Sequence, residues 1–447
     1  MITERNNISG WGNYPVQCSD IFTPENEEEL QAFLVNSEKL TPRGNGRSYG
    51  DSAIGRNTLK SSKLNKILDF NSEDGTITCQ SGVLLSSILN VIVPHGYFLA
   101  VTPGTKYVSV GGATASDVHG KNHNRKGNFS KHITYIKLLL SSGETLLCSP
   151  TLNQEVFWAS CGGMGQTGFI IEVCLKLQKI ETAYMVQHNI RCFNLKEVFN
   201  AFSQFSNYDY RIAWIDSFQK SKKLGRGVFT GANHCSLDML SIERKTEPFE
   251  FRKKNAFAVP FMMPSFLLNG FFVRILNLWR WKKAPTIDSK NVVCFEDLFF
   301  PLDSVLDWHK LYGPKGFVQY QFALPLENAE EGIEQILQIV SNARDNSLLT
   351  VIKQFGKSNE NTLLSFPMEG YTASLDFKVS ATLFPLLEKL DEIVLQFGGR
   401  LYLTKDARMN LNMMIAGYPR LKEFQDILNT VNSDNKFTSA QRERINY

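Results

Sequence analysis

Two glycine-rich stretches of this chain combine backbone freedom with basic side chains. Residues 44–50 read GNGRSYG, and residues 110–123 read VGGATASDVHGKNH. Glycine lacks a Cβ, so the backbone N–H groups of such stretches can approach anionic oxygens closely and wrap a pyrophosphate. Either stretch alone is weak evidence. Together they predict a pocket for a phosphate-bearing ligand.

The first stretch superficially resembles the dinucleotide-binding fingerprint of a Rossmann fold. Its third glycine, Gly50, comes one position late, and we do not expect residues 40–43 (LTPR) to form the buried strand that should precede it. The fingerprint has its meaning only between such a strand and a helix. We therefore reject a nicotinamide-type reading of this stretch.

Short strands and helices must position these stretches, and their alternation is typical of an α+β unit. Before a domain boundary near residue 182, we expect helices at 27–40, 83–93 and 154–159 and strands at 66–70, 76–80, 133–140, 144–148 and 169–177. The composition then shifts toward aromatic residues, and the expected elements are strands at 211–218 and 316–324 and helices at 329–342 and 381–397. Both of these later helices have an apolar face suited to packing on a sheet.

The composition excludes several classes of protein. With 447 residues, 43% of them hydrophobic, the chain can bury substantial cores, and a formal net charge of +4 does not indicate a nucleic-acid partner. The eight cysteines lack the paired spacing of a zinc site, so we expect reduced packing residues and no metal. No basic region followed by an apolar stretch opens the chain, which predicts a location on the reducing, cytoplasmic side of the membrane.

One segment, residues 256–281, is unusually apolar. Its first part has no charged residue, Trp279 and Trp281 stand among cations at its end, and basic residues flank both sides. Pro260 and Pro264 interrupt it, so it is too short and too broken to span a membrane. Tryptophans among basic residues are typical of an anchor at the membrane interface. A buried helical hairpin is the alternative.

Three ordered strings carry a more specific resemblance. They are PRGNGRSYGD from residue 42, TPGTKYVSVGGATASDVHGKNHNRKGNF from residue 102 and FWASCGGMGQTGFI from residue 157. They resemble the FAD-binding domain, of the PCMH type, of the vanillyl-alcohol-oxidase superfamily. Within it, the chain resembles the family of decaprenylphosphoryl-ribose 2-oxidases, because QYQF, VIKQFG, LLSFP and FGGRLYLTKD follow in that family's order.

The resemblance implies an α+β fold of two domains. Residues 1–182, completed by residues 400–447, would form the FAD-binding domain. Residues 183–399 would form a substrate domain, an antiparallel sheet flanked by helices. A mobile apolar segment at about 252–283 would lie near the membrane.

By this resemblance, the two glycine-rich stretches and the last part of the chain hold FAD. The residues implied are Arg43, Gly44, Asn45, Gly46, Arg47, Ser48, Tyr49, Gly50, Asp51, Ser52, Gly104, Thr105, Ser109, Val110, Gly111, Gly112, Ser116, Asp117, Val118, His119, Ile170 and Tyr402. Relatives that attach FAD covalently often use a histidine where this chain has Arg47, and a guanidinium is not a nucleophile at ordinary pH. We therefore expect non-covalent FAD.

The reaction needs a group that accepts the proton of a carbinol or stabilises its developing charge. The resemblance makes Lys405 the best candidate, with His119 and Tyr49 as further catalytic candidates, although Tyr49 could instead pack on the flavin. Substrate contacts are expected from Lys121, Trp214, Gln319, Gln321, Lys353 and Lys405. Trp214 could equally be a core residue of its strand.

Two positions depart from the family's pattern. Ser374 stands where the family has a cysteine, and Thr372 replaces an amide side chain. These changes leave the flavin chemistry intact and bear on which sugar and which lipid are accepted.

The resemblance implies oxidation of the C2 hydroxyl of a polyprenylphosphoryl pentose to a keto sugar. This would be the first half of an epimerisation that makes precursors of cell-envelope polysaccharide. An NAD(P)H-dependent keto-reductase would complete it, and the protein would lie peripherally on the inner face of the membrane. Two alternatives stay open: a soluble alditol or aldonolactone oxidase, and a membrane-surface protein that binds FAD without turnover.

Overall fold

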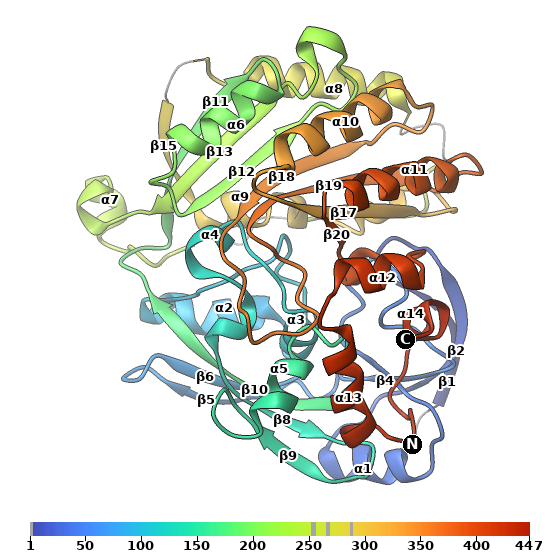
Figure 1. The fold of residues 1–447 in the computed structure, drawn as a ribbon. Coiled ribbons are helices and arrows are strands. Elements are labelled where there is room, and N and C mark those ends of the chain that lie inside the picture. Colours follow the sequence, from blue (N-terminus) through green and yellow to red (C-terminus); the bar gives the residue numbers. More distant parts are fainter. Residues whose placement is uncertain (1–2, 252–255, 265–268, 287–288) are drawn as a thin grey trace.

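The computed structural model describes residues 3–251, 256–264, 269–286 and 289–447 (Figure 1). Helices and mostly antiparallel sheets are mixed along the chain, as the expected α+β class requires. The glycine-rich stretches lie in the lower half of Figure 1, and a large sheet fills the upper half.

Two sheets build the lower half. The first has the strand order β1 (Thr3–Ser9), β2 (Val16–Phe22), β4 (Asn57–Lys60), β3 (Thr41–Arg43), and the second has the order β5 (Ile67–Asn71), β6 (Thr76–Gln80), β10 (Phe169–Lys179), β8 (Ile133–Leu139), β9 (Thr145–Cys148), with β7 (Tyr97–Leu99) beside β10. Their helices are α1 (Glu27–Val35), α2 (Leu85–Ile92), α3 (Val110–Ala115), α4 (His123–Lys126) and α5 (Gln154–Ser160).

The segment before the first glycine-rich stretch corrects one expectation. Residues 41–43 do form a strand, β3, because they pair in parallel with β4, a partner that local sequence does not reveal. No helix follows within residues 44–56, so this stretch still does not lie between a strand and a helix, as the Rossmann fingerprint requires. The helix expected at 27–40 ends at Val35, since the chain must turn to enter β3.

The upper half is an eight-stranded sheet, antiparallel at every pairing. Its strand order is β15 (Ser289–Cys294), β11 (Tyr184–Cys192), β13 (Gly227–His234), β12 (Tyr210–Ile215), β18 (Leu349–Phe355), β19 (Gly370–Lys378), β17 (Phe317–Pro325), β20 (Arg400–Leu401). The helices α6 (Leu195–Gln204), α10 (Ala329–Asn342) and α11 (Leu383–Gln396) cover one face (Figure 1).

Alternation along these strands gives the sheet two different faces. Phe322, Ile352 and Leu375 point toward the helices and are buried in the main apolar core. Gln321, Ser374 and Val351 are aligned across three neighbouring strands, so they share the opposite face. That face is left for ligands.

The last helices return to the lower half. They are α12 (Leu411–Gly417), α13 (Leu421–Val431) and α14 (Ala440–Ile445), seen in red at the right of Figure 1. Phe437 forms a bridge with Leu40 beside β3, which joins the tail to the N-terminal sheet. The expected division into residues 1–182 with 400–447 and residues 183–399 stays a prediction; β10 ends at Lys179, β11 begins at Tyr184, and β20 still belongs to the large sheet.

The apolar segment at 256–281 is only partly described, since residues 252–255 and 265–268 lie outside the described residues. Its second half is helix α8 (Gly270–Lys283), which begins directly after Asn269 caps the N–H groups of Phe271 and Phe272. Smaller elements nearby are α7 (Ile242–Lys245), β14 (Phe257–Ala258), α9 (Phe295–Phe299) and β16 (Val305–Leu306). Within the described ranges, every helix falls short of the length and apolarity that crossing a bilayer needs.

Candidate functional site

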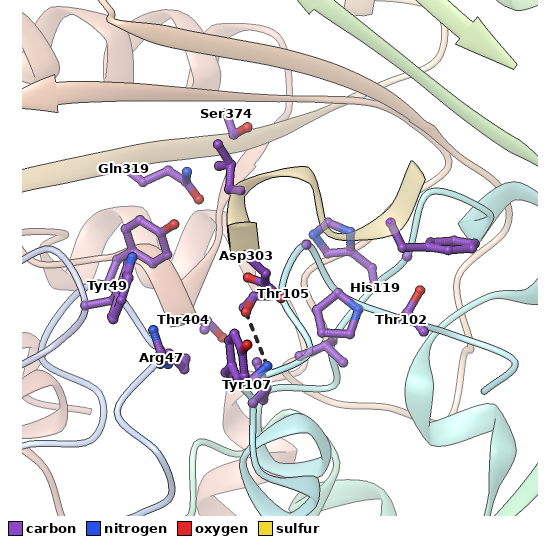
Figure 2. A pocket seen from close by; sticks show the side chains of 18 of the residues that line it. Arg47, Tyr49, Thr102, Thr105, Tyr107, His119, Asp303, Gln319, Ser374 and Thr404 are labelled. Atoms are coloured by element: carbon purple, nitrogen blue, oxygen red, sulfur yellow. Dashed lines mark hydrogen bonds between the residues drawn. The ribbon is translucent and has the colours of Figure 1, made fainter. Parts of the chain in front are cut away.

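A cavity of about 860 Å³ lies between the glycine-rich stretches and the free face of the large sheet. This volume is in the range of ligand pockets, roughly 300–1,000 Å³. Figure 2 shows Arg47 and Tyr49 on one side, His119 and Thr102 on the other, and Gln319 and Ser374 reaching in from the sheet. Residues far apart in sequence therefore meet in one space.

Most of the residues that the sequence indicated line this cavity. They are Arg43, Gly44, Asn45, Gly46, Arg47, Ser48, Tyr49, Ser52, Gly104, Thr105, Ser109, Gly111, Gly112, Ser116, Val118, His119, Lys121, Ile170, Trp214, Gln319, Gln321, Lys353, Tyr402 and Lys405. Gly50, Asp51, Val110 and Asp117 are not part of its wall.

The first stretch presents bare backbone to the cavity. Within the described chain, none of the N–H groups of residues 44–48 donates a hydrogen bond. A Cβ on Gly44 would collide with the Ser109 hydroxyl, so glycine lets the two stretches touch. Gly46 has a φ of +63°, which favours glycine. The Asn45 amide closes the contact by donating to the Tyr107 carbonyl over 2.7 Å.

The second stretch begins with the N-cap of α3. The Ser109 hydroxyl accepts a hydrogen bond from the Gly112 N–H, and a Cβ on Gly111 would lie 2.6 Å from that of Ser81. Gly104 faces open space, with no atom within 4 Å of the place of a Cβ. Two polar atoms on the cavity wall, Arg47 Nε and Ser81 Oγ, are buried without a hydrogen-bond partner among the described residues. Free N–H groups and orphaned donors fit an anionic group such as the pyrophosphate of FAD.

Arg47 is held by aromatic rings and not by a carboxylate. Its guanidinium lies 3.9 Å from the centre of the Trp11 ring and 5.5 Å from that of Tyr107. Burial lowers its pKa, and the nearby Asp303 partly offsets this. A flat cation between two rings is preorganised to face a phosphate or a flavin edge.

Gly50 and Asp51 contact the C-terminal part of the chain, and their expected contact with the cofactor stays a prediction. Asp51 is buried, and its carboxylate accepts a bidentate pair of hydrogen bonds from Arg444 of α14, at 2.8 and 2.9 Å. The same guanidinium donates to Asp406 over 2.6 Å. Gly50 packs on the Asp406 carbonyl so closely that no Cβ would fit. These contacts fasten the first stretch to the turn that carries Lys405.

Asp117 also lies in a buried network and not on the cavity wall. Its carboxylate accepts hydrogen bonds from Asn128 over 2.6 Å, from Ser365 over 2.7 Å and from the Ser130 N–H over 2.9 Å. His123 contacts the Asn128 amide from the other side. The network ties the second stretch to the loop after β18, and so fixes His119 against the sheet. Val110 is buried in the adjoining core.

Lys405 lies directly on Tyr49. Its Nζ is 3.6 Å from the centre of the Tyr49 ring, and the Tyr49 N–H donates to the Thr404 carbonyl over 3.0 Å. Burial lowers the pKa of Lys405 to about 7, although Asp376 acts in the opposite direction. Burial also holds the pKa of Tyr49 well above its ordinary value, so its phenol stays protonated and packs instead of titrating.

His119, Gln321 and Lys353 form a contiguous group. The Gln321 amide lies 3.1 Å from His119 Nε2 and donates to the Thr372 hydroxyl over 3.2 Å, while Lys353 Nζ lies 3.4 Å from His119 Nδ1. Burial and then Lys353 hold the pKa of His119 well below its usual range, so the ring is neutral. Burial lowers the pKa of Lys353 to about 7. Lys353 can therefore exchange a proton near neutral pH, whereas His119 stays neutral there and offers a nitrogen that accepts a hydrogen bond.

The remaining substrate candidates differ in the contacts that they already make within the protein. The Lys121 ammonium donates to the Phe299 carbonyl over 3.0 Å, and burial lowers its pKa to about 8. Gln319 donates to Asp376 over 2.6 Å. Trp214 is almost fully buried and also lines the cavity, so both interpretations of its role stay predictions. The Tyr402 hydroxyl donates to the Ser116 carbonyl over 3.2 Å.

Sequence reasoning missed Asp376 and Asp303. Asp376 is buried behind Gln319, and burial raises its pKa to about 6. It shares its sheet face with Ser374, two positions earlier, so strand alternation could have indicated it. Asp303 lies on the short segment between α9 and β16 and accepts from the Lys106 N–H over 2.9 Å (Figure 2); no local signal marks it.

All eight cysteines are free thiols, and six of them are buried. Among the described residues, no cluster of three or more histidine, cysteine, aspartate or glutamate side chains could hold a metal ion.

Comparison with known proteins identifies what this chain resembles. Residues 19–149 match the FAD binding domain family. A decaprenylphosphoryl-β-D-ribose oxidase from Mycolicibacterium smegmatis is 34% identical over 454 residues, which cover 99% of this chain and 98% of that protein. An L-gulonolactone oxidase from Scyliorhinus torazame is 30% identical over 162 residues, 35% of this chain and 36% of that protein. A D-lactate dehydrogenase from Anaerostipes hadrus is 30% identical over 162 residues, 34% of each chain.

These findings confirm the resemblance that the ordered motifs indicated, the FAD cofactor and the two-domain flavoprotein class of the fold. Similarity over the whole length explains why the motifs of both halves follow in the expected order.

The geometry of Arg47 predicts that FAD is held without a covalent bond to this position. Purified protein should be yellow and should release intact FAD into the supernatant when denatured by acid or heat, because the guanidinium cannot form the link. Flavin fluorescence that migrates with the denatured polypeptide on a gel would contradict this.

The lowered pKa of Lys353 predicts a pH-dependent stability. Between about 7, the value in the folded protein, and 10.5, its ordinary value, the unfolded chain binds more protons, so stability rises with pH across this window. The free energy of unfolding of the wild type relative to Lys353→Met should increase over it, by at most about 1.4 kcal/mol per pH unit.

Urea unfolding at several pH values measures this difference. Lys389→Met, which removes an exposed lysine, controls for the loss of one charge. A difference between wild type and Lys353→Met that stays constant from pH 7 to 10 would show that the folded amine titrates normally.

Proposed function

The chain belongs to the family of decaprenylphosphoryl-β-D-ribose oxidases and is an FAD-dependent oxidoreductase, and from this premise we propose that it oxidises the C2 hydroxyl of a polyprenylphosphoryl pentose to a ketone. The observation that carries the proposal is the meeting of Lys405, His119 and Lys353 beside the glycine-rich stretches, in one cavity. These three groups are bases or donors suited to a carbinol.

The reaction removes a hydride from the carbinol carbon and a proton from its oxygen, which leaves a carbonyl. When bound, the flavin supplies the acceptor of the hydride. Lys405 and His119 are the groups that hold or take the proton: each is neutral over part or all of the range near pH 7, because burial disfavours its charged form. Gln321 orients His119 through the contact at Nε2.

The polar sheet face recognises the sugar in this proposal. Gln319 and Gln321 present amides, and Ser374 presents a hydroxyl, in the pattern that suits hydrogen bonding to a polyol. Asp376 fixes Gln319, so the amide enters the cavity with a set orientation. Thr372 is almost fully buried, and its hydroxyl accepts a hydrogen bond from Gln321, so it orients that amide.

The aldonolactone-oxidase alternative is weaker. The L-gulonolactone oxidase matches only 35% of this chain, whereas the decaprenylphosphoryl-ribose oxidase matches 99% of it. A binding protein without turnover is also weaker, because it would have no use for three desolvated bases facing the cavity.

The product of this reaction is a keto sugar, and inverting the carbon requires a hydride from another source. We propose that a separate NAD(P)H-dependent reductase supplies it, so that the two activities together form an epimerase for cell-envelope precursors. A lipid-linked substrate also calls for access to the membrane surface.

Helix α8 is the surface that we propose for this contact, on the inner face of the membrane. Phe271 is 70% exposed, Phe272 54% and Leu276 55%, and Trp279 lies beside them on the same exposed side. Arg274, Lys282 and Lys290 are exposed on or close to α8. A row of aromatic and aliphatic side chains with cations around it suits an anionic lipid surface, where apolar groups enter and basic groups meet phosphates. The exposed apolar side also argues against a buried hairpin.

The role of Lys405 predicts a separation of binding from chemistry. Lys405→Ala should keep bound FAD, but a polyprenylphosphoryl pentose should reduce this flavin about a hundredfold more slowly than in the wild type. The reason is that a contact that strengthens in the transition state is worth on the order of 3 kcal/mol. Anaerobic stopped-flow bleaching of the flavin measures this rate. Lys389→Ala, on the exposed side of α11, should behave like the wild type.

Reduction of Lys405→Ala at the wild-type rate would remove Lys405 from the reaction. Bleaching of the wild type by aldonolactones, with none by any lipid-linked pentose, would replace the proposed function by the soluble alternative.

The exposed side of α8 predicts binding to lipid. Vesicles with anionic lipid should bind the protein more strongly than neutral ones, by about 1 kcal/mol for each basic residue near the surface, and added salt should weaken the interaction. Replacing Phe271, Phe272 and Leu276 by serine should reduce cosedimentation with vesicles and leave FAD in place, because these side chains are mostly exposed.

Leu147→Ser with Leu152→Ser is the matched control, since both leucines are exposed near β9, in the lower half of the molecule (Figure 1). Equal binding of the triple variant and this control would exclude α8 as the membrane surface.

A further inference from the structure

The cavity extends beyond the reacting groups to α8, and we call this end of it the chamber beneath α8. Its walls come from four strands at the far side of the sheet and from α8 itself: Gln187, Asn189, Ile212, Trp214, Val228, Thr230, Asn291, Trp279, Arg280 and Lys283. Neither the glycine-rich stretches nor the groups around Lys405 contribute to these walls. The chamber therefore lies outside the set of residues that the sequence assigned to the cofactor.

The orientation of α8 is fixed by contacts on its inner side. The buried Asn277 amide donates to Asp216 over 2.9 Å, and the Trp281 indole donates to the Cys192 carbonyl over 3.0 Å. Arg191 donates to the Ala284 carbonyl at the end of the helix over 3.0 Å. Because 3.6 residues make one turn, a helix held through positions 277 and 281 also turns position 280 toward the sheet.

Arg280 uses this orientation to face the chamber. Its guanidinium lies 4.6 Å from the centre of the Trp214 ring, and the surrounding protein lowers its pKa by desolvation. Lys283, one turn later, also lines the chamber, with its Nζ 4.9 Å from the centre of the Trp279 ring. Two cations thus project into one end of the cavity.

A neighbouring arginine shows what a purely structural role looks like here. Arg226 is buried, and its guanidinium donates two hydrogen bonds to Asp216, at 2.7 and 3.1 Å. Among the described residues, no carboxylate forms such an ion pair with Arg280, whose guanidinium lies over the Trp214 ring. Arg280 is exposed and lines the cavity, and a guanidinium that faces a cavity without a carboxylate partner is suited to a ligand that brings its own negative charge.

The same helix carries the exposed apolar residues Phe271, Phe272, Ile275 and Leu276, and Leu276 and Phe272 lie one and two turns before Arg280. A ligand that places a phosphate at Arg280 would find an apolar surface within one helix diameter, about 10–12 Å. The chamber wall adds the amides of Gln187, Asn189 and Asn291 as donors for phosphate or ether oxygens.

We propose that the chamber beneath α8 is the binding site for the phosphate group of a prenyl phosphate, with Arg280 as its main contact and Lys283 as its second cation, and with the prenyl chain leaving along α8. The proposal deepens the proposed function and rests on it for the lipid-linked nature of the substrate. In it, the phosphate is held at one end of the cavity while the sugar extends toward Lys405.

Calorimetric titration of the FAD-loaded protein tests the site without turnover. Farnesyl phosphate is the probe, and farnesol and inorganic phosphate separate the contributions of chain and charge. Farnesyl phosphate should bind more tightly than either of them. Arg280→Gln should weaken the binding of farnesyl phosphate by about tenfold to a hundredfold, which is the usual contribution of a hydrogen bond to a charged group. The binding of farnesol should not change.

Arg274→Gln is the matched control. It lies on the same helix, its guanidinium lies over the Phe218 ring, and it does not line the cavity, so its loss should leave farnesyl phosphate binding intact. Retained flavin absorbance in both variants shows that the fold is unchanged. A second readout is the Michaelis constant for a lipid-linked pentose, which Arg280→Gln should raise with little change in kcat, since the phosphate contact is the same before and during the reaction.

Unchanged farnesyl phosphate binding in Arg280→Gln would overturn the inference, and so would inorganic phosphate that binds as tightly as farnesyl phosphate. The two proposals fail separately. Loss of farnesyl phosphate binding in Arg280→Gln, together with no flavin reduction by any lipid-linked pentose, would remove the proposed function and keep this site. Normal turnover with an unchanged Michaelis constant in Arg280→Gln would keep the proposed function and remove this phosphate site.

Discussion

The burial of several cations around one cavity is the constraint on which this structure depends. Lys405, Lys353, Lys121 and His119 all have their pKa lowered, and burial is the largest cause for each. The nearest carboxylate to act on Lys405, Asp376, is itself buried behind Gln319 and has a raised pKa. Such an excess of basic groups is costly in a protein without ligands and becomes favourable when anionic groups enter. A flavin dinucleotide and a sugar phosphate are ligands of that kind.

Holding these groups together requires contacts between distant parts of the chain. Arg444, almost at the end of the sequence, joins Asp51 beside the first glycine-rich stretch to Asp406 beside Lys405. The network of Asp117, Asn128 and Ser365 does the same between the second stretch and the loop after β18. Neither network faces the cavity. Both networks explain why acidic residues occur close to a basic site. Their carboxylates accept hydrogen bonds from arginine and amide groups, so they do not pair with Lys405 or Lys353.

The sequence predicted best what local pattern determines. Helix α10 matches its expected bounds, because its apolar periodicity is complete, and the ordered motifs indicated most of the cavity wall. It predicted less well what depends on distant partners. The resemblance assigned Asp51 and Asp117 to the cofactor, which stays a prediction, but it could not indicate their distant partners, Arg444 and Asn128. Strand β3 was missed because its pairing with β4 is not local, and Asp376 because no motif contains it.

The choice of cation along the cavity follows the same physical logic. In the proposal, the groups near the reacting carbon are two lysines, which can take up and release a proton near pH 7 after desolvation, and a histidine that desolvation keeps neutral. In the chamber beneath α8 the main cation is an arginine, which keeps its charge even when burial lowers its pKa. A phosphate needs a permanent positive partner, whereas a carbinol needs one that titrates. In the proposed arrangement, the order of these side chains along the cavity therefore orients a lipid-linked sugar with its phosphate toward α8 and its hydroxyl toward Lys405.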